Sequence, residues 1–337
     1  MNFLIRLFFL FFVIILCVPL NAQENSVDQR IANVENIVSK LPNILGDINL
    51  RHRYDDAGAT TINSFDVRRA RLDFRGNISK PVSYRLHIDF ANSPKILDVL
   101  VNWKINDYMS LQAGQYKIPF SLENPYNPNN LEMIDNSLAI THLVNYSDVS
   151  GISANGRDIG IGIIGRFFQK EGYSLINYSL GIFNGSGINT ADTNEAKDFS
   201  GIVSFNPSKN LTLAVSHYNG KTDVGDNSVV RLRNGIGAKY ENNRLLLRSE
   251  LIQGTTGNLK SQGAYAVLGY YVHEKVQALT RYDYFNRNLM YSTWQRNYTV
   301  GLNYLPVNNL RLQLNYTYRT TRENNSNYIV TQLWVKF

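Results

Sequence analysis

The segment FDVRRARLDFRG, residues 65–76, carries four arginines within eight positions of a stretch that otherwise alternates like a β-strand. Arg69, Arg71 and Arg75 fall on one face of such a strand, opposite apolar side chains. Like charges two residues apart on one face repel, so the arrangement requires surroundings that use positive charge. A guanidinium group stays charged and offers a fork of donors that fits phosphate or carboxylate oxygens. The chemistry that this segment predicts is therefore the attraction of small anions.

Patterns of catalytic or metal-binding residues are missing from the rest of the sequence. The histidines are scattered, neither H-E-x-x-H nor G-x-S-x-G occurs, and no Asp, Glu and His residues have the spacing of metal ligands. Ser83 and His87 share a strand face but lie about 13 Å apart along it, too far for a hydrogen bond. The single cysteine, Cys17, lies in a segment expected to be removed. We therefore expect no enzyme, no catalytic residue, no metal and no cofactor.

The first 22 residues have the features of a secretory signal peptide. Arg6 precedes an apolar run of about 14 residues, and small or polar residues lead to Ala22. An uncleaved membrane anchor is the alternative, but the run is short for a spanning helix. No later segment approaches the ~20 apolar residues that such a helix needs. We expect an exported protein that is cleaved near Ala22.

Residues 23–45 predict a short helix. Their apolar positions follow a spacing of four and three, at Val27, Ile31, Val34, Val38 and Leu41. A heptad pattern with β-branched residues is typical of a coiled coil, and Pro42 interrupts it. Two to three heptads are marginal alone, so an amphipathic helix that packs on its own chain is the alternative. In a symmetric oligomer these residues would form a periplasmic helical bundle, here a trimer helix.

From residue 46 to residue 337 the apolar period changes to two. Apolar and polar residues alternate in VSYRLHIDFA, residues 82–91, and again in residues 309–320. About sixteen such segments of about ten residues follow one another, the length that a tilted strand needs to cross a bilayer. Short turns such as 77–81 alternate with longer connections such as 254–260, as in outer-membrane barrels. The sequence predicts an all-β fold, a transmembrane antiparallel up-and-down barrel; composition alone also fits a soluble exported β-protein.

Two further features agree with a barrel. The fifth and sixth strands are separated by residues 119–156, and a connection this long is usually functional. It falls at the third long-loop position, where sixteen-stranded porins fold a loop inward. The chain ends on Phe337, which resembles the C-terminal signal by which the barrel assembly machinery recognises outer-membrane barrels.

Three stretches, residues 65–91, 111–137 and 156–165, together resemble the phosphate-selective porin O and P family in a form typical of Bacteroidetes-like bacteria. The resemblance implies a trimeric, sixteen-stranded channel in the outer membrane of a Gram-negative bacterium, with arginine ladders and lysines that conduct anions. Many members have a coiled-coil-like segment before the barrel, which matches residues 27–41. Where ERS is common in the long loop, this chain has IDNS, residues 134–137, so the charge of the constriction is expected to differ.

If the apolar faces contact outer-membrane lipid, the alternate residues line a lumen. The candidates for an anion-conducting lumen are Arg69, Arg71, Arg75, Arg85, Lys117, Arg166, Arg231, Arg233, Arg248, Arg281 and Arg311. A water-filled pore with low-dielectric walls focuses the field of such a ladder and concentrates anions. Carboxylates on the same faces would moderate the field by pairing, namely Asp73, Asp89, Asp98, Glu250 and Asp283. The expected function is a diffusion channel for small anions, phosphate or polyphosphate among them.

Two other functions remain open at this point. A general, weakly selective porin would use the same charges only to solvate a wide lumen. A structural or adhesive barrel would have a plugged interior, although five small residues expected in the lumen favour open space: Gly160, Gly162, Gly235, Gly237 and Gly301. Nucleic acid is not an expected partner, because the basic residues are interleaved with strands of membrane length.

Overall fold

The computed structural model of the chain describes residue 31 and residues 41–56, 61–126, 131–192, 195–224 and 227–337. The chain divides into two units, residues 1–41 and 42–337. In the first unit Ile31 is helical and exposed, and Leu41 is exposed. The expected signal peptide, residues 1–22, and the heptad positions Val27, Val34 and Val38 of the expected helix lie outside the described residues. No helix in the described part of the chain is long and apolar enough to cross a membrane.

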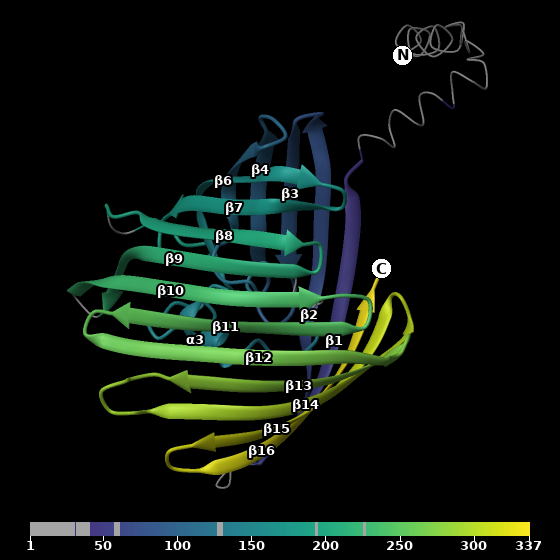
Figure 1. Cartoon of the computed structure of the whole chain (residues 1–337), viewed down its shortest axis with the longest axis vertical. Coiled ribbons are helices and arrows are strands. Elements are labelled where there is room, and N and C mark those ends of the chain that lie inside the picture. Colours follow the sequence, from purple (N-terminus) through teal and green to yellow (C-terminus); the bar gives the residue numbers. More distant parts are fainter. Residues whose placement is uncertain (1–30, 32–40, 57–60, 127–130, 193–194, 225–226) are drawn as a thin grey trace, which may run out of the picture. The chain divides into compact units, whose positions relative to one another are not determined.

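The second unit contains sixteen strands and one short helix within its described residues (Figure 1). The strands are β1 (Asn43–Asp56), β2 (Thr61–Ser79), β3 (Val82–Asp89), β4 (Lys95–Lys104), β5 (Met109–Lys117), β6 (Arg157–Lys170), β7 (Tyr173–Phe183), β8 (Asp198–Ser208), β9 (Leu211–Val224), β10 (Asn227–Glu241), β11 (Leu245–Thr256), β12 (Leu259–His273), β13 (Val276–Asn286), β14 (Trp294–Val307), β15 (Leu310–Thr321) and β16 (Asn325–Lys336). The helix, α3 (Leu138–Leu143), lies between β5 and β6.

The sheet is a closed antiparallel barrel, because each strand pairs with its sequence neighbours and β16 also pairs with β1. The last residue takes part in this closure. Phe337 N donates to Gly46 O at 3.0 Å, and Gly46 N donates to Phe337 O at 2.8 Å. A Cβ atom on residue 46 would lie 2.3 Å from the Phe337 ring, so glycine leaves the room that this ring needs. The predicted all-β barrel of about sixteen strands is confirmed.

Side chains alternate along the strands between a buried polar face and an exposed apolar face. In β15, Arg311, Gln313 and Asn315 are buried, whereas Leu312 and Leu314 are each 44% exposed. A soluble sheet would bury its apolar face instead. Apolar residues outside and polar residues inside are the arrangement of a barrel that contacts lipid around a polar lumen.

Tyrosines form a row on the outer face of β13, β14 and β15. The ring centroids of Tyr282 and Tyr298 lie 5.2 Å apart, and those of Tyr298 and Tyr318 lie 6.4 Å apart. Register pairs place the three residues side by side across the strands. Outward-facing aromatic residues in a row across strands are typical of the girdles of outer-membrane barrels.

The strand boundaries differ from the expected ones at β1 and between β11 and β12, among other places. β1 begins at Asn43 rather than at residue 46, because the chain after Pro42 already pairs with β2. β11 continues to Thr256 and β12 begins at Leu259, so the loop expected at 254–260 is a short turn. Backbone pairing continues there through polar residues, which the apolar alternation does not mark.

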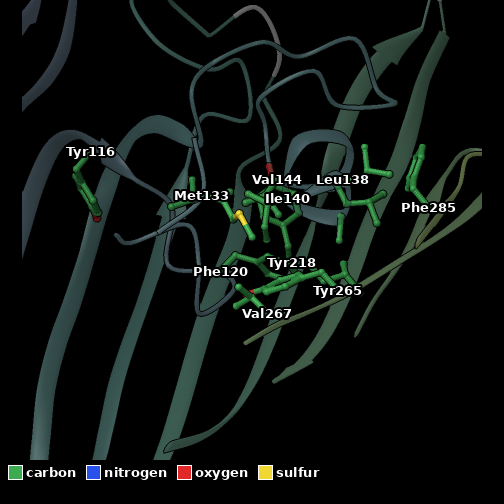
Figure 2. Packing of buried hydrophobic residues seen from close by; sticks show 14 of the residues in the cluster. Tyr116, Phe120, Met133, Leu138, Ile140, Val144, Tyr218, Tyr265, Val267 and Phe285 are labelled. Atoms are coloured by element: carbon green, nitrogen blue, oxygen red, sulfur yellow. The ribbon is translucent and has the colours of Figure 1, made fainter. Parts of the chain in front are cut away.

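The connection between β5 and β6 packs against the inner wall of the barrel. α3 begins after Ser137, whose hydroxyl accepts a hydrogen bond from Ile140 N. Figure 2 shows the buried cluster that joins this connection to the wall. Its members include Phe120, Met133, Leu138, Ile140, Leu143 and Val144 from the connection, and Tyr218, Ile252, Tyr265, Val267 and Phe285 from strands β9 to β13.

Glycines of the wall make room for this connection. A Cβ atom on Gly237 would lie 2.8 Å from Leu122, and one on Gly263 would lie 2.8 Å from Ala139. A Cβ atom on Gly235 would lie 3.4 Å from Phe120. Neighbouring side chains occupy the corresponding space at the other glycines that we expected to leave the lumen open, with Phe183 at Gly160, Tyr116 at Gly162 and Asn315 at Gly301. The expectation of open space at the five glycines is therefore wrong.

Candidate channel constriction

Basic side chains line the inner wall where the β5–β6 connection approaches it. Seven of the predicted lumen residues are buried at inward positions of their strands: Arg69, Arg71, Arg231, Arg233, Arg248, Arg281 and Arg311. A buried guanidinium group requires partners, because the loss of hydration is costly. Guanidinium groups paired with carboxylates are neutralised, and those without such partners can still attract a mobile anion.

A β-bulge in β2 brings one more arginine to the inner face. Asn49 pairs with Arg69 and Leu50 pairs with Val67, so Arg68 is the extra residue of β2. An extra residue reverses the alternation of a strand, and inward positions are even-numbered before the bulge and odd-numbered after it. Arg68 accordingly donates to loop atoms, with Arg68 Nη2 2.7 Å from Asp135 Oδ1. The alternation assigned Arg69, Arg71 and Arg75 to one face and missed Arg68.

Carboxylates neutralise much of the ladder, as expected for four of the five acidic residues. Arg71 pairs with Asp89, both Arg75 and Arg85 pair with Asp73, and Arg281 pairs with Asp283 at 2.7 Å. Asp98, the fourth of these acidic residues, pairs with Arg85 and Arg157. Glu250 differs, because it binds the β5–β6 connection rather than an arginine: it accepts hydrogen bonds from Leu122 N and Ser121 Oγ.

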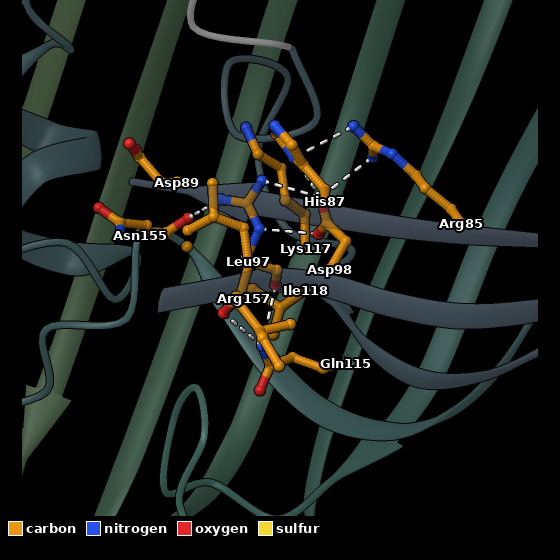
Figure 3. Close-up of polar contacts among 12 residues, drawn as sticks. Arg85, His87, Asp89, Leu97, Asp98, Gln115, Lys117, Ile118, Asn155 and Arg157 are labelled. Carbon is orange, nitrogen blue, oxygen red and sulfur yellow. Dashed lines mark hydrogen bonds and ion pairs between the residues drawn. The ribbon is translucent and has the colours of Figure 1, made fainter. Parts of the chain in front are cut away.

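Asp98 of β4 joins three basic side chains, Arg85 and His87 of β3 and Arg157 of β6 (Figure 3). Arg157 Nε donates to Asp98 Oδ1 at 2.7 Å, and Arg157 Nη2 lies 3.1 Å from Asp98 Oδ2. Arg85 Nη1 also lies 3.1 Å from Asp98 Oδ2, and His87 Nδ1 lies 2.9 Å from it. Asp98 and Asp73 together face three guanidinium groups, those of Arg75, Arg85 and Arg157, which leaves the local charge positive.

Two cationic groups of this region have no carboxylate partner within the described residues. Arg69 is 8% exposed, its side chain forms no hydrogen bond there, and its Nη1 atom is buried without an acceptor. Lys117 donates to the backbone carbonyl oxygens of Asn124 and Tyr126, which carry no net charge. The charges of Arg157, Arg71 and Arg69 repel the Lys117 ammonium group, and the Asp98 carboxylate attracts it. The wall beside the start of the connection therefore carries an excess of positive charge.

The remaining predicted residues are bound into the wall or lie away from this region. Arg231 pairs with Asp198 at 3.0 Å, Arg233 pairs with Asp148 at 2.8 Å, and Arg248 pairs with Glu132 at 3.0 Å. The Arg311 guanidinium lies 5.1 Å from the ring centroid of Trp334. Arg166 is exposed near the short turn between β6 and β7, and Arg75 is half exposed.

The arginines of the wall influence the pKa values of acidic groups in the connection. The Asp148 carboxyl is buried, which opposes ionisation, but Arg233 and Arg231 hold its pKa below the usual value. Burial raises the pKa of the Glu123 carboxyl, although Arg248 and Arg281 oppose this shift. Asp148 is therefore a fixed negative charge that binds the connection to β10.

Sequence reasoning missed several residues of this region. Arg51, Arg53 and Arg157 line the inner wall with Arg68, and loop residues Glu132, Asp135 and Asp148 neutralise basic groups of the wall. The strict alternation of β1 carried a signal for Arg51 and Arg53, which occupy inward positions. Nothing in the sequence pattern of the connection marks which wall residue each of its acidic residues meets.

A closed barrel of sixteen antiparallel strands, apolar outside, polar inside and lined by a loop between β5 and β6, defines the class of porins, the diffusion channels of outer membranes. The profile of the family described as "Phosphate-selective porin O and P" matches residues 43–244 and 233–332. The chain belongs to this family. It is a channel protein of the outer membrane of a Gram-negative bacterium, not an enzyme.

Solved porin structures have the same fold at low sequence identity. The anion-selective porin from Comamonas acidovorans superimposes with a TM-score of 0.72 at 15% identity, covering 88% of this chain and 99% of that one. Pseudomonas putida OprB gives 0.70 at 9% identity, covering 91% and 97%. The trimer form of Vibrio cholerae OmpT gives 0.64 at 10% identity, covering 88% and 99%. The search of curated proteins found no match to this chain.

Proposed function

We propose that this porin conducts small anions, with phosphate and related oxyanions as its preferred cargo. The observation that carries the proposal is the group of Arg69, Arg71, Lys117 and Arg157 on the wall, of which only Arg71 and Arg157 have carboxylate partners. Positive charge in a narrow pore with low-dielectric walls concentrates anions. The description of the family and the anion selectivity named for the Comamonas acidovorans porin support the same class of cargo.

Oxyanions suit this site better than halide ions because of the donor geometry. Arg69 Nη1 and Arg71 Nη1 are buried donors without acceptors within the described residues. A tetrahedral oxyanion presents several oxygens and can accept from more than one such fork at once. Conduction requires that binding stay weak, and the paired arginines around the site limit the net charge.

Single-channel currents in a planar bilayer test the proposal. Under a KCl gradient, the reversal potential should have the sign of anion preference, and phosphate at about 1 mM, the range of a weak site, should reduce the chloride current. Cation preference, or no conductance, would overturn the proposal. Anion preference without phosphate block would instead identify a general, weakly selective porin, a function that the extensive pairing of the arginines favours.

We further propose that the protein assembles as a homotrimer and enters the membrane through recognition of its C-terminal residue by the barrel assembly machinery. The trimer form of Vibrio cholerae OmpT and the heptad spacing of residues 27–41 support the first proposal. The second rests on Phe337, an exposed aromatic residue whose backbone pairs with Gly46 at the seam between β1 and β16.

A further inference from the structure

The loop carboxylate of Asp135 lies among three arginines of the wall, which we call the arginine cluster: Arg51 and Arg53 of β1, and Arg68 of β2. Asp135 Oδ1 accepts a hydrogen bond from Arg68 Nη2 at 2.7 Å. Arg51 Nη1 lies 3.9 Å from Asp135 Oδ1, and Arg53 Nη1 lies 3.8 Å from Asp135 Oδ2. Asp135 therefore occupies the position that a small anion bound to the cluster would occupy.

The cluster is not saturated by this carboxylate. The distances from Asp135 to Arg51 and Arg53 exceed hydrogen-bond length. The other donors of Arg51 are used by Asp66, and Arg53 Nη2 is used by Asp55. Within the described residues, the Nη1 atoms of Arg51 and Arg53 thus turn toward Asp135 without a hydrogen bond to it. A tetrahedral oxyanion could accept hydrogen bonds from these Nη1 atoms, whereas the planar Asp135 carboxylate, held at this position, does not.

Water and small ions can reach the cluster. The Asp135 side chain is 32% exposed, and those of Arg51 and Arg53 are 21% and 25% exposed. Partial exposure of all three side chains allows a small ion to exchange at the cluster.

The backbone around Asp135 is fixed by contacts that do not involve its carboxylate. Ile134 is buried with Tyr328 and Val330, and Ile134 N donates to Asn315 Oδ1 at 2.9 Å. Arg281 Nη1 donates to the carbonyl oxygen of Asp135 at 2.8 Å. The loop therefore presents the carboxylate to the cluster, and the carboxylate is not needed to hold the loop.

We propose that Asp135 is a tethered anion that competes with permeating oxyanions for the arginine cluster and thereby sets the selectivity of the channel. This inference rests on the proposed anion conduction. A tethered ligand has a high effective concentration at its site, so it lowers the apparent affinity for any free ligand of the same chemistry. Each passing oxyanion must displace Asp135, and the returning carboxylate speeds its release, which keeps the cluster a weak site suited to conduction.

Asp135→Asn in the full-length protein removes the competing charge and keeps the shape of the side chain. The matched control is Asp107→Asn, which removes the same charge from an exposed turn where Asp107 pairs with Lys104. We expect phosphate to block the chloride current of Asp135→Asn at a concentration about tenfold lower than in the parent, whereas Asp107→Asn resembles the parent. An unchanged block in Asp135→Asn, with anion preference intact in the parent, would overturn the inference and leave the proposed function standing. Cation preference in the parent would overturn the proposed function itself.

Bromide in crystals of the two proteins tests the same inference independently of conductance. The anomalous signal of bromide should appear between Arg51, Arg53 and Arg68 in Asp135→Asn and be absent there in the parent. Heat resistance of the barrel in detergent should be equal in both, because the anchors at Ile134 and Arg281 remain. No bromide at the cluster in Asp135→Asn would show that Asp135 is an ordinary ion-pair partner and would overturn the proposal.

Discussion

Arg71 Nε donates to Asp89 Oδ2 at 2.8 Å directly across the β2–β3 pair. Arg69, two residues earlier on the same face, has no carboxylate partner in the described part of the chain. Removal of one member of a buried ion pair leaves the other charge uncompensated, whereas removal of an unpaired cation relieves repulsion. Residues that look equivalent in a ladder therefore differ in what they contribute to stability and to the lumen charge.

Arg69→Gln should keep the barrel folded and weaken phosphate block, with the half-blocking concentration about tenfold higher, equivalent to about 1.4 kcal/mol. Arg71→Gln is the matched comparison on the same strand face. It should lower the heat resistance of the barrel in detergent, because Asp89 then stays buried without its partner at a cost of about 3–5 kcal/mol. Equal behaviour of the two variants in both assays would contradict the distinction between them.

Glu250→Ala should loosen the start of the β5–β6 connection and raise single-channel conductance and noise. Glu250 accepts hydrogen bonds from Leu122 N at 2.7 Å, from Ser121 Oγ and Glu123 N at 3.0 Å each, and from Tyr265 Oη at 2.7 Å. Each bond to a charged group contributes about 1.5–3 kcal/mol.

The control for this change is Glu241→Ala, which removes an exposed carboxylate paired with Lys239. Its conductance should match that of the parent. If Glu250→Ala also matches the parent, the apolar packing around α3 holds the connection without the Glu250 contacts.

The barrel was predictable from the sequence because lipid and lumen impose a strict period of two on every strand. In β15 the alternation of Arg311, Leu312 and Gln313 is enough to assign both faces. The bulge at Arg68 was not predictable, since two adjacent arginines have the same polarity and alternation gives no sign of the register shift. The alternation of a sequence assigns residues to the inner or outer face of a strand. A bulge exchanges the two faces from that point on and leaves the composition of the strand unchanged.

Pairings in the candidate constriction were even less accessible to sequence reasoning. Asp98 and Arg157 are 59 residues apart, and Arg68 and Asp135 are 67 residues apart. Such contacts depend on where the β5–β6 connection lies against the wall. That position follows from the packing of side chains such as Leu122 against Gly237, which no local pattern encodes.

Ile31→Asp combined with Val38→Asp should weaken the trimer without unfolding the barrel. Charges at two heptad core positions oppose helix association, while the strands that form the barrel begin later, at Asn43. Crosslinking and native mass measurement in mild detergent provide the readout. Ile31→Leu with Val38→Leu is the control and should remain trimeric. A trimer unaffected by the two aspartates would mean that the apolar stripe packs elsewhere.

His142 should make the stability of the protein sensitive to acid. Its ring stacks on Phe285 with centroids 4.5 Å apart, and its Nδ1 atom lies 3.1 Å from Ser147 O. Burial lowers the pKa of His142 below its ordinary value; the Ser147 carbonyl and Asp148 oppose this shift, and Arg287 adds to it. The unfolded chain therefore binds a proton more readily than the folded chain. The contribution of His142 to stability is complete above the ordinary pKa of about 6.5 and declines as the pH falls from there toward the folded-state pKa.

His142→Gln isolates this effect from those of other buried groups whose pKa values are shifted. Glu123, whose pKa is raised, acts in the opposite direction, because its protonation on acidification favours the folded state. We expect the apparent unfolding temperature in detergent to drop more between pH 7.5 and pH 5 in the parent than in His142→Gln, since the variant lacks the group that resists protonation. The difference should be of order 2–4 °C for each kcal/mol that His142 contributes. Equal drops in the two proteins would show that His142 can accept its proton within the folded barrel at no cost.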